Sequence, residues 1–469
     1  MNKLTSSIST LLRVSLFCFF VYLFISSLSP LHSEIDTLWT RNYGGSEDDR
    51  GLSVWENRDG SYILAGVYGY ADVYVVRTDI FGNTLWERTY GGDGADWARG
   101  VCEGHNGGFY VVGDYDYFAS PETSGIWLLR LDESGDTLWT RVYPGTMDGY
   151  DIKPTRDGNY IIAGSYAYPG GYGLSDFYLV KVDSLGNILW SGIYGASSLD
   201  EAHAVDETRD GGYIAVGFTS SFGEGMTDYY LVRVDSVGDT LWTRTFGGGG
   251  VDEAWGVCAT SDGGFAVVGY STSFGPDEIW LVKVDSMGNY LWDRLFEYGW
   301  GTGYSVIETK DKGLVIVGER YYAHLIVIRT DSLGNTLWSW PPYHLSTGTS
   351  IRQTHDGGYI IGVLTGLVKT TPEVGVGEKG YDFNPMRISI TPNPSGGVFD
   401  VVYSLSDIGE VRLDLFDGSG RRVKQLFGGS GGDGVHRLRF DLRDLGSGLY
   451  FLRLRAGKKE RIKKVLIVR

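Results

Sequence analysis

The sequence predicts an all-β fold: a ring of repeated sheets followed by a smaller β-sandwich. The main observation is a Leu-Trp pair that recurs seven times in 469 residues, at intervals of 46 to 53 residues. A period of this length indicates a repeat architecture. The 70 glycines, with many Tyr, Trp, Val and Thr residues, suit short strands joined by tight turns. The repeated tryptophans are Trp39, Trp86, Trp139, Trp190, Trp242, Trp292 and Trp338.

Residues 1–33 have the layout of a secretory signal peptide. Lys3 and Arg13 flank the start of this segment, the apolar run VSLFCFFVYLFI follows, and small residues lead to Ser33. An apolar centre of this length is too short to span a membrane comfortably. The alternative is an uncleaved membrane anchor, because the small-residue end is imperfect.

Residues 34–371 carry the repeat. Units such as DEAHAVDETRDGGYIAVG and DYYLVRVDSVGDTLWTRTFGG contain four short apolar or alternating runs. The second and third runs are apolar on both faces, as a strand packed between two layers requires. The connections DGG and DSVGD predict hairpin turns, because Gly tolerates positive φ. Four antiparallel strands repeated seven times predict a seven-bladed β-propeller, since ring closure leaves only short, protected edges.

The ends of the repeat predict how the ring closes. After the seventh DGG, at residues 356–358, the chain continues with YIIGV and GLVKT, and the pattern stops without a Leu-Trp strand. The spare Leu-Trp strand is the first one, at residues 36–43. We therefore expect the N-terminal strand to complete the last blade as its outer strand.

The Leu-Trp hairpin resembles the tryptophan repeats of propellers of the pyrroloquinoline-quinone type. The resemblance implies that the shared residues hold neighbouring blades together. It covers the repeat and not a quinone site, so we expect no cofactor apart from the Ca²⁺ considered below. The matching residues are Asp183, Gly186 and Trp190 in one unit and Asp235, Gly238 and Trp242 in the next.

Two segments follow the repeat. Residues 372–384, TPEVGVGEKGYDF, have the Pro, Gly and charge content of a linker. Residues 385–469 show alternating runs of Val, Leu, Phe and Arg with turn residues between them. This pattern predicts a small antiparallel sandwich of about seven strands.

The sandwich segment closely resembles the Ig-like C-terminal sorting domain of proteins exported by type IX secretion. The resemblance implies a secreted or surface-attached protein that crosses the outer membrane, with the secretion machinery as the partner of residues 385–469. An accessory domain without a sorting role is the alternative. The matching residues are Pro392, Asn393, Pro394, Asp417, Gly418, Gly420, Gly446, Gly448, Leu449, Tyr450 and the terminal KKVLIV.

The charge is distributed unevenly along the chain. The net charge is −17, yet residues 381–469 hold sixteen Lys and Arg against ten Asp and Glu, so the repeat region is still more acidic. An acidic body argues against nucleic acid and against an anionic membrane surface as partners.

An acidic residue precedes the inner strand in five repeats. Carboxylates that converge on a central channel could hold Ca²⁺ or a cationic peptide, because hard cations prefer oxygen ligands. The alternative is that each Asp caps its own turn by accepting backbone N–H bonds. These residues are Asp49, Asp96, Asp148, Asp200 and Asp252.

The loops between the second and third strands are rich in aromatic residues and vary in length. Exposed rings near carboxylates are typical of sugar-binding and peptide-binding sites. The alternative is that these rings seal the ends of the blades. The candidate ligand-binding residues are Tyr70, Tyr115, Tyr117, Tyr168, Tyr172, Phe222, Phe274 and Tyr322.

Catalytic signatures are weak. The sequence has no H-E-x-x-H motif, and His203 after Glu201 has no evident nucleophile beside it. The sequence therefore favours a secreted or surface-displayed binding or scaffold protein. The alternatives are an extracellular glycan-acting hydrolase or lyase that uses channel carboxylates, and a structural protein of the surface layer.

Overall fold

The computed structural model describes Ile35 and residues 37–44, 50–69, 71–116, 124–167, 171, 174–275, 277–296, 300–321, 324–340, 345–372, 387–391, 395–405, 409–417, 421–431, 434–457 and 459–468. These residues contain strands and no helix, so none of them forms a helix that could cross a membrane. The predicted signal peptide and nearly all of the predicted linker lie outside the described residues.

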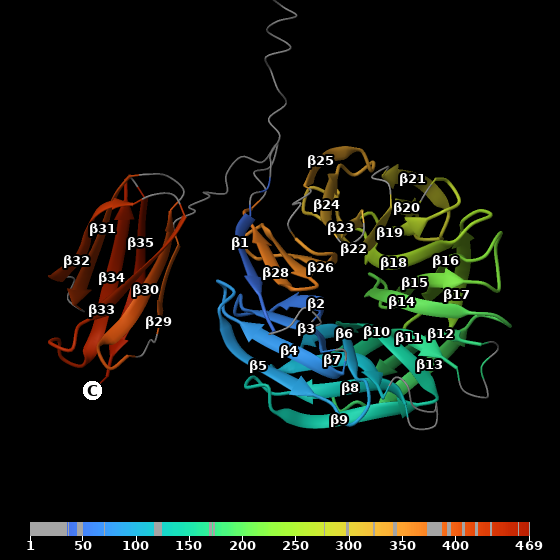
Figure 1. Ribbon diagram of the computed structural model, residues 1–469, viewed down its shortest axis with the longest axis horizontal. Helices are drawn as coiled ribbons and strands as arrows, with labels where there is room; N and C mark the ends of the chain where they lie inside the picture. The colour runs from blue at the N-terminus through green and yellow to red at the C-terminus, as the bar shows by residue number, and fades with distance from the viewer. Residues whose placement is uncertain are drawn as a thin grey trace, which may run out of the picture. The chain divides into compact units, whose positions relative to one another are not determined.

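The described residues before 373 form seven four-stranded antiparallel sheets, the blades of a β-propeller (Figure 1). The inner strands are β2 (Arg50–Glu56), β6 (Trp97–Glu103), β10 (Thr146–Pro154), β14 (Asp200–Glu207), β18 (Asp252–Ala259), β22 (Gly301–Glu308) and β26 (Gly348–Gln353). The second strands are β3 (Tyr62–Tyr68), β7 (Phe109–Tyr115), β11 (Tyr160–Tyr166), β15 (Tyr213–Thr219), β19 (Phe265–Ser271), β23 (Leu314–Arg320) and β27 (Tyr359–Val363).

The third and outer strands complete each blade. The third strands are β4 (Asp72–Thr78), β8 (Gly125–Leu131), β12 (Asp176–Val182), β16 (Asp228–Val234), β20 (Glu278–Val284), β24 (His324–Thr330) and β28 (Gly366–Thr370). The outer strands are β5 (Thr84–Tyr90), β9 (Thr137–Pro144), β13 (Ile188–Tyr194), β17 (Thr240–Phe246), β21 (Tyr290–Phe296), β25 (Thr336–Trp340) and β1 (Thr37–Asn42). We number the blades 1 to 7 from β2 onward, so that β26, β27, β28 and β1 form blade 7.

The hydrophobic core consists of layers between adjacent blades. Strands β15 and β16 are buried along their whole length, which agrees with their apolar residues on both faces. Between blades 1 and 2, Ile63 and Val75 pack in one cluster with Val111 and Leu129. The inner strands lie around the centre of the ring in Figure 1, each beside the next, and β26 contacts β2 to complete the ring.

The repeated tryptophan joins each blade to the next. Gly238, in the turn between β16 and β17, has a φ of 90° and lies under the indole of Trp190 from the preceding blade. A Cβ at Gly238 would lie 2.7 Å from Trp190 Cε3, so only glycine fits both the backbone and the contact. Trp190 Nε1 also donates to Ser236 O at 3.0 Å.

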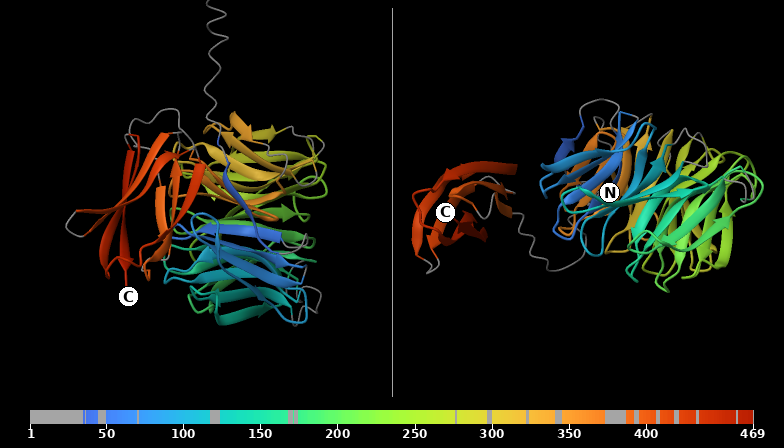
Figure 2. Two further views of the ribbon diagram at one scale, coloured as in Figure 1. Left: turned by 60° about the vertical axis from the view of Figure 1, so that its left-hand side comes forward. Right: turned by 90° about the horizontal axis from the view of Figure 1, so that it is seen from below.

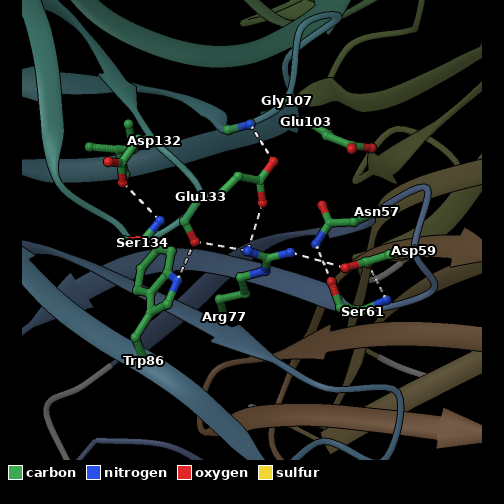
Figure 3. Close-up of polar contacts among 12 residues, drawn as sticks. Asn57, Asp59, Ser61, Arg77, Trp86, Glu103, Gly107, Asp132, Glu133 and Ser134 are labelled. Carbon is green, nitrogen blue, oxygen red and sulfur yellow. Dashed lines mark hydrogen bonds and ion pairs between the residues drawn. The ribbon is translucent and has the colours of Figure 1, made fainter. Parts of the chain in front are cut away.

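Figure 3 shows the same kind of junction between blades 1 and 2. Trp86 Nε1 donates to Glu133 O at 2.9 Å. Arg77, on the third strand of blade 1, makes ion pairs with Asp59 at 3.0 Å and with Glu133 at 2.6 Å. Tryptophan, glycine and ion pairs therefore fasten the outer part of the ring.

The N-terminal strand closes the ring as predicted. Strand β1 pairs antiparallel with β28, with Arg41 opposite Leu367, and Figure 1 shows the blue first strand beside the orange β28. Trp39 packs on Gly82 of blade 1, as the other tryptophans do at their junctions. Ile35 shares a buried cluster with Trp338, the tryptophan of blade 6.

The C-terminal unit is a sandwich of two antiparallel sheets, which confirms the predicted class. One sheet has the order β29-β30-β33 and the other β32-β31-β34-β35, and Figure 2 shows the two sheets face to face. Phe399, Val401, Leu413 and Leu452 belong to the core between them. The strands are β29 (Arg387–Thr391), β30 (Val398–Leu405), β31 (Gly409–Asp417), β32 (Arg422–Gly431), β33 (Gly434–Asp441), β34 (Gly448–Ala456) and β35 (Lys459–Ile467).

Candidate binding site

Three of the aspartates before the inner strands bind their own loops. Asp96, Asp200 and Asp252 each accept a backbone N–H from the residue four positions earlier, at 2.8 to 2.9 Å. Asp200 also accepts bonds from the hydroxyls of Thr219 and Ser221. These carboxylates are buried and sit within their own blades. Burial raises the pKa of Asp96.

Asp148 occupies a different place from the other aspartates. Thr146 pairs with Tyr166 as Asp200 pairs with Thr219, and the register shifts after Thr146. Asp148 therefore lies further along the inner strand, where it reaches Arg99 of the preceding blade at 3.3 Å. The sequence could not reveal this shift, because the extra residue changes no turn motif.

No group of three His, Cys, Asp or Glu side chains that could hold a metal ion occurs among the described residues. Asp49, the remaining predicted ligand, lies outside the described residues. The calcium site stays a prediction.

The aromatic loop residues stand on separate blades. Each packs against an aromatic residue of the third strand in its own blade: Tyr115 on Trp127 with ring centroids 5.4 Å apart, Phe222 on Tyr230 at 5.7 Å, and Phe274 on Trp280 at 5.2 Å. Phe222 and Phe274 remain 44% and 51% exposed, so they cover the blade end and still offer area to solvent. Tyr70, Tyr117, Tyr168, Tyr172 and Tyr322 lie outside the described residues.

A different set of aromatic and charged side chains comes together at the start of the inner strands. The rings of Tyr150 and His203 lie 4.7 Å apart, and His203 stacks on Trp255 at 3.9 Å. Trp255 contacts Tyr304 at 5.8 Å, and the Arg99 guanidinium lies 4.7 Å from the Tyr150 ring. We call Arg99, Tyr150, His203, Trp255 and Tyr304 the channel belt. Its members come from five consecutive blades.

Arg99 lies between two carboxylates. Its Nε donates to Asp114 at 2.8 Å, and its Nη2 lies 3.3 Å from Asp148 Oδ1. Burial raises the pKa of Asp148 to about 7, and the nearby charge of Asp114 adds to this shift. One guanidinium cannot fully compensate two buried carboxylates, so the pair favours one bound proton.

Glu201 has the opposite environment. Burial would raise its pKa, but hydrogen bonds from His203, Tyr150 and Ser175 outweigh burial and lower it. Tyr150 Oη donates to Glu201 Oε2 at 3.1 Å, and His203 Nε2 lies 3.7 Å from the same oxygen. The belt is thus flanked by carboxylates of unequal acidity.

Two further carboxylates border the belt. Burial raises the pKa of Glu253. Glu319 accepts a bond from Tyr304 Oη at 3.0 Å and one from Thr347 Oγ1 at 2.7 Å. The indole Nε1 of Trp255 is buried and has no hydrogen-bond partner among the described residues. The belt therefore combines an acidic border with a free donor.

Of the belt residues, only His203 was predicted from the sequence, together with Glu201 and Asp148 of its acidic border. A signal was present in the repeat itself. The position of His203 holds Leu52, Arg99, Tyr150, Trp255, Tyr304 and Thr349 in the other blades, whereas the turn glycine and the outer tryptophan recur. Aligning the repeats on the turns that follow their inner strands reveals this variable position from the sequence.

The fold defines a seven-bladed β-propeller with a separate Ig-like C-terminal sandwich. Solved structures with the propeller fold support this class at the level of the fold. The WD40 domain of Neurospora crassa Pan2 matches with a TM-score of 0.50 and 10% identity, over 75% of this chain and 98% of that one. A virginiamycin B lyase from Staphylococcus aureus matches with a TM-score of 0.50 and 10% identity, over 72% and 99%.

The C-terminal part of the chain identifies its destination. Residues 389–468 match the secretion system C-terminal sorting domain, the family called Por secretion tail. The protein is therefore a β-propeller protein with a type IX sorting tail, exported to the cell surface or beyond it.

One further solved structure and the curated proteins were also compared with the chain. PorZ, a surface component of the type IX secretion system of Porphyromonas gingivalis, matches with a TM-score of 0.46 and 13% identity, and the match covers 92% of this chain and 60% of that one. A comparison with curated protein sequences finds no match.

Proposed function

We propose that the exported propeller is a binding module whose ligand docks on the channel belt. The observation that carries this proposal is the variability of one position within an otherwise regular repeat. Residues that serve the blade, such as the turn glycine Gly238 and its tryptophan partner, recur from blade to blade. A position that holds a different side chain in almost every blade, and at which five of the seven side chains lie against one another, is suited to recognition instead.

The chemistry of the belt favours a basic peptide segment. Asp114, Asp148, Glu201, Glu253 and Glu319 outnumber the single guanidinium of Arg99. Aromatic faces attract cationic groups, and the acidic border adds to this attraction. The free Nε1–H of Trp255 offers a donor to a peptide carbonyl.

The test is binding of the full chain to a lysine- and arginine-rich peptide, with a glutamate-rich peptide and neutral oligosaccharides as comparisons. We expect the basic peptide to bind, and Glu253→Gln to weaken it by about tenfold because one border charge is lost. Asp239→Asn is the matched control, since Asp239 is an exposed acid in a turn at the opposite end of its blade. Equal affinity of native chain and Glu253→Gln, or binding of sugars alone, would contradict the proposal.

A second candidate function is hydrolysis or elimination on a glycan. It rests on the unequal carboxylates: the pKa of Asp148 is raised to about 7, whereas that of Glu201 is lowered. Such a pair divides the roles of general acid and general base. Release of reducing sugar that is lost in both Asp148→Asn and Glu201→Gln would establish this activity, and no release from a panel of polysaccharides would remove it.

A further inference from the structure

A repeated carboxylate links neighbouring blades at the end of the ring opposite to the belt. The last residue of the inner strand accepts a backbone N–H from the turn between the first two strands of the preceding blade. Glu103 binds Arg58 N at 2.9 Å, Glu207 binds Arg156 N at 2.9 Å, Glu308 binds Ser261 N at 2.7 Å, and Glu56 binds His355 N at 2.9 Å. These four bonds fasten four of the seven junctions.

The other three junctions lack this carboxylate. By strand register, the equivalent positions hold Pro154, Ala259 and Gln353. At two of these junctions the turn of the preceding blade still carries a basic residue, Arg209 opposite Ala259 and Lys310 opposite Gln353. The basic side chain thus remains where the acidic one is missing.

Cavities occur at the same two junctions. A pocket of about 220 Å³ is lined by Arg209 and Ala259, and a larger one of about 400 Å³ by Lys310 and Gln353. The coincidence at both places has a simple physical reason. Replacing a glutamate by a residue without its carboxylate leaves room beside a cation that the repeat normally neutralises.

The larger pocket contains a second cation, Arg352, that makes no direct contact with a carboxylate of the described residues. The Arg352 guanidinium lies 4.5 Å from the Trp55 ring centroid, and its buried Nε has no hydrogen-bond partner. Among the described residues, no hydrogen bond or ion pair joins Arg352 to a carboxylate. Asp206, on β14, interacts with Arg352 electrostatically and accepts a hydrogen bond from Ala259 N at 2.8 Å.

Among the described residues that line the pocket, Glu56 supplies the one carboxylate, and it is already engaged. It accepts the backbone N–H of His355 and lies 3.0 Å from His355 Nδ1. Burial raises the pKa of Glu56, while the neighbouring His355 lowers it. Lys310 and Arg352 therefore leave the pocket with a positive character, although the propeller as a whole is acidic.

We propose that the pocket formed by Lys310, Arg352, Gln353 and Trp55 binds the carboxylate of a small acidic ligand. The ligand carboxylate takes the place of the missing glutamate beside Lys310 and receives the free donors of Arg352. A guanidinium suits a carboxylate because its planar donors bind both oxygens. An acidic sugar and an acidic amino acid both supply this group. This site is independent of the belt and of the ligand proposed there.

The test is calorimetric titration of the full chain with glucuronate, glutamate and glucose. We expect a carboxylate to bind and glucose not to bind, and the stronger of glucuronate and glutamate identifies the source. Gln353→Glu restores the repeat's own carboxylate, so it should weaken binding by at least about tenfold while the fold is kept. Arg352→Gln should have a similar effect by removing the charged donors.

Ala259→Glu is the matched control, because it fills the smaller pocket at another junction and leaves Lys310 and Arg352 untouched. Its carboxylate affinity should equal that of the native chain. Absence of carboxylate binding, equal binding of glucose, or an affinity unchanged in both Gln353→Glu and Arg352→Gln would overturn the proposal. Tryptophan fluorescence on urea unfolding verifies that each variant is folded.

Discussion

At the scale of single residues, the junctions depend on pairs in which one blade supplies tryptophan and the next supplies glycine. Gly82, Gly135, Gly186, Gly238, Gly288 and Gly334 all have positive φ, and a Cβ at any of them would lie within 3 Å of the preceding blade's tryptophan. Backbone conformation and close approach therefore require glycine for two separate reasons.

These two reasons can be separated by mutation. Gly238→Ala should lower the free energy of unfolding by about 1–3 kcal/mol more than Gly263→Ala, because only the first displaces a packed indole. Gly263 has a φ of 88° and no atom within 4 Å of an added Cβ, so it reports the backbone cost alone. Urea unfolding followed by tryptophan fluorescence measures both. Equal losses would show that the tryptophan contact contributes nothing beyond the backbone effect.

The Asp148 carboxyl predicts a pH dependence of stability. Its pKa in the folded protein is about 7, above the value of about 3.9 in an unfolded chain. Between these values the unfolded state has lost the proton and the folded state retains it, so rising pH favours unfolding, by at most about 1.4 kcal/mol per pH unit. Below about pH 4 and above about pH 7 this contribution is constant.

Asp148→Asn should remove this slope, because asparagine resembles the protonated carboxyl. We expect the variant to gain stability relative to the native chain as the pH rises from 4.5 to 7.5. The measurement is the free energy of unfolding in urea at a series of pH values. A difference between variant and native chain that stays the same at every pH would contradict the raised pKa.

At the scale of elements, the N-terminal strand is the unit that makes the ring continuous. Strand β1 contributes Trp39 to the junction with blade 1, and Tyr43 after it donates to Gly82 O at 2.8 Å. The preceding Ile35 packs with Trp338 at the junction with blade 6. The strand therefore serves two junctions at once.

Removal of the Trp39 indole should lower the stability of the propeller and also loosen the N-terminal strand. Trp39→Ala should lower the free energy of unfolding by about 3–5 kcal/mol, and it should also release the first residues to protease, because β1 has few other buried groups. Trp242→Ala, at a junction within the continuous chain, is the control. If Trp39→Ala lost as much unfolding free energy as Trp242→Ala but showed no cleavage at the N-terminus, the backbone hydrogen bonds to β28 alone would hold β1 in place.

At the scale of the whole molecule, the chain joins a β-propeller to a C-terminal sorting domain. All fourteen tryptophans lie in the first 340 residues, so their fluorescence reports the propeller and not the sorting domain. The folding of the propeller can therefore be measured by fluorescence whether or not the sorting domain is present.

Deletion of residues 385–469 should abolish export. We expect the truncated protein to remain inside the outer membrane, because the sorting domain at 389–468 is missing. The measurement is immunoblotting of cell, surface and medium fractions. The tryptophan unfolding midpoint should not change, which verifies that the retained protein is folded. Export of the truncated chain at the native level would assign the sorting signal elsewhere.

The sequence by itself determined the repeat, the class and the destination. The period of the Leu-Trp pairs, the glycine turns and the spare first strand predicted seven blades closed by β1, because periodicity and turn chemistry are local properties of the chain. The sorting domain was also readable from its motifs in order.

Only the tertiary structure decided which side chains meet. Arg99, Tyr150, His203, Trp255 and Tyr304 are about 50 residues apart from one to the next, and ring closure brings them together. The contact of Asp148 with Arg99 and the pockets beside Arg209 and Lys310 likewise depend on the neighbouring blade. The physical reason is that these contacts form between blades, whereas each repeat encodes chiefly its own strands and turns.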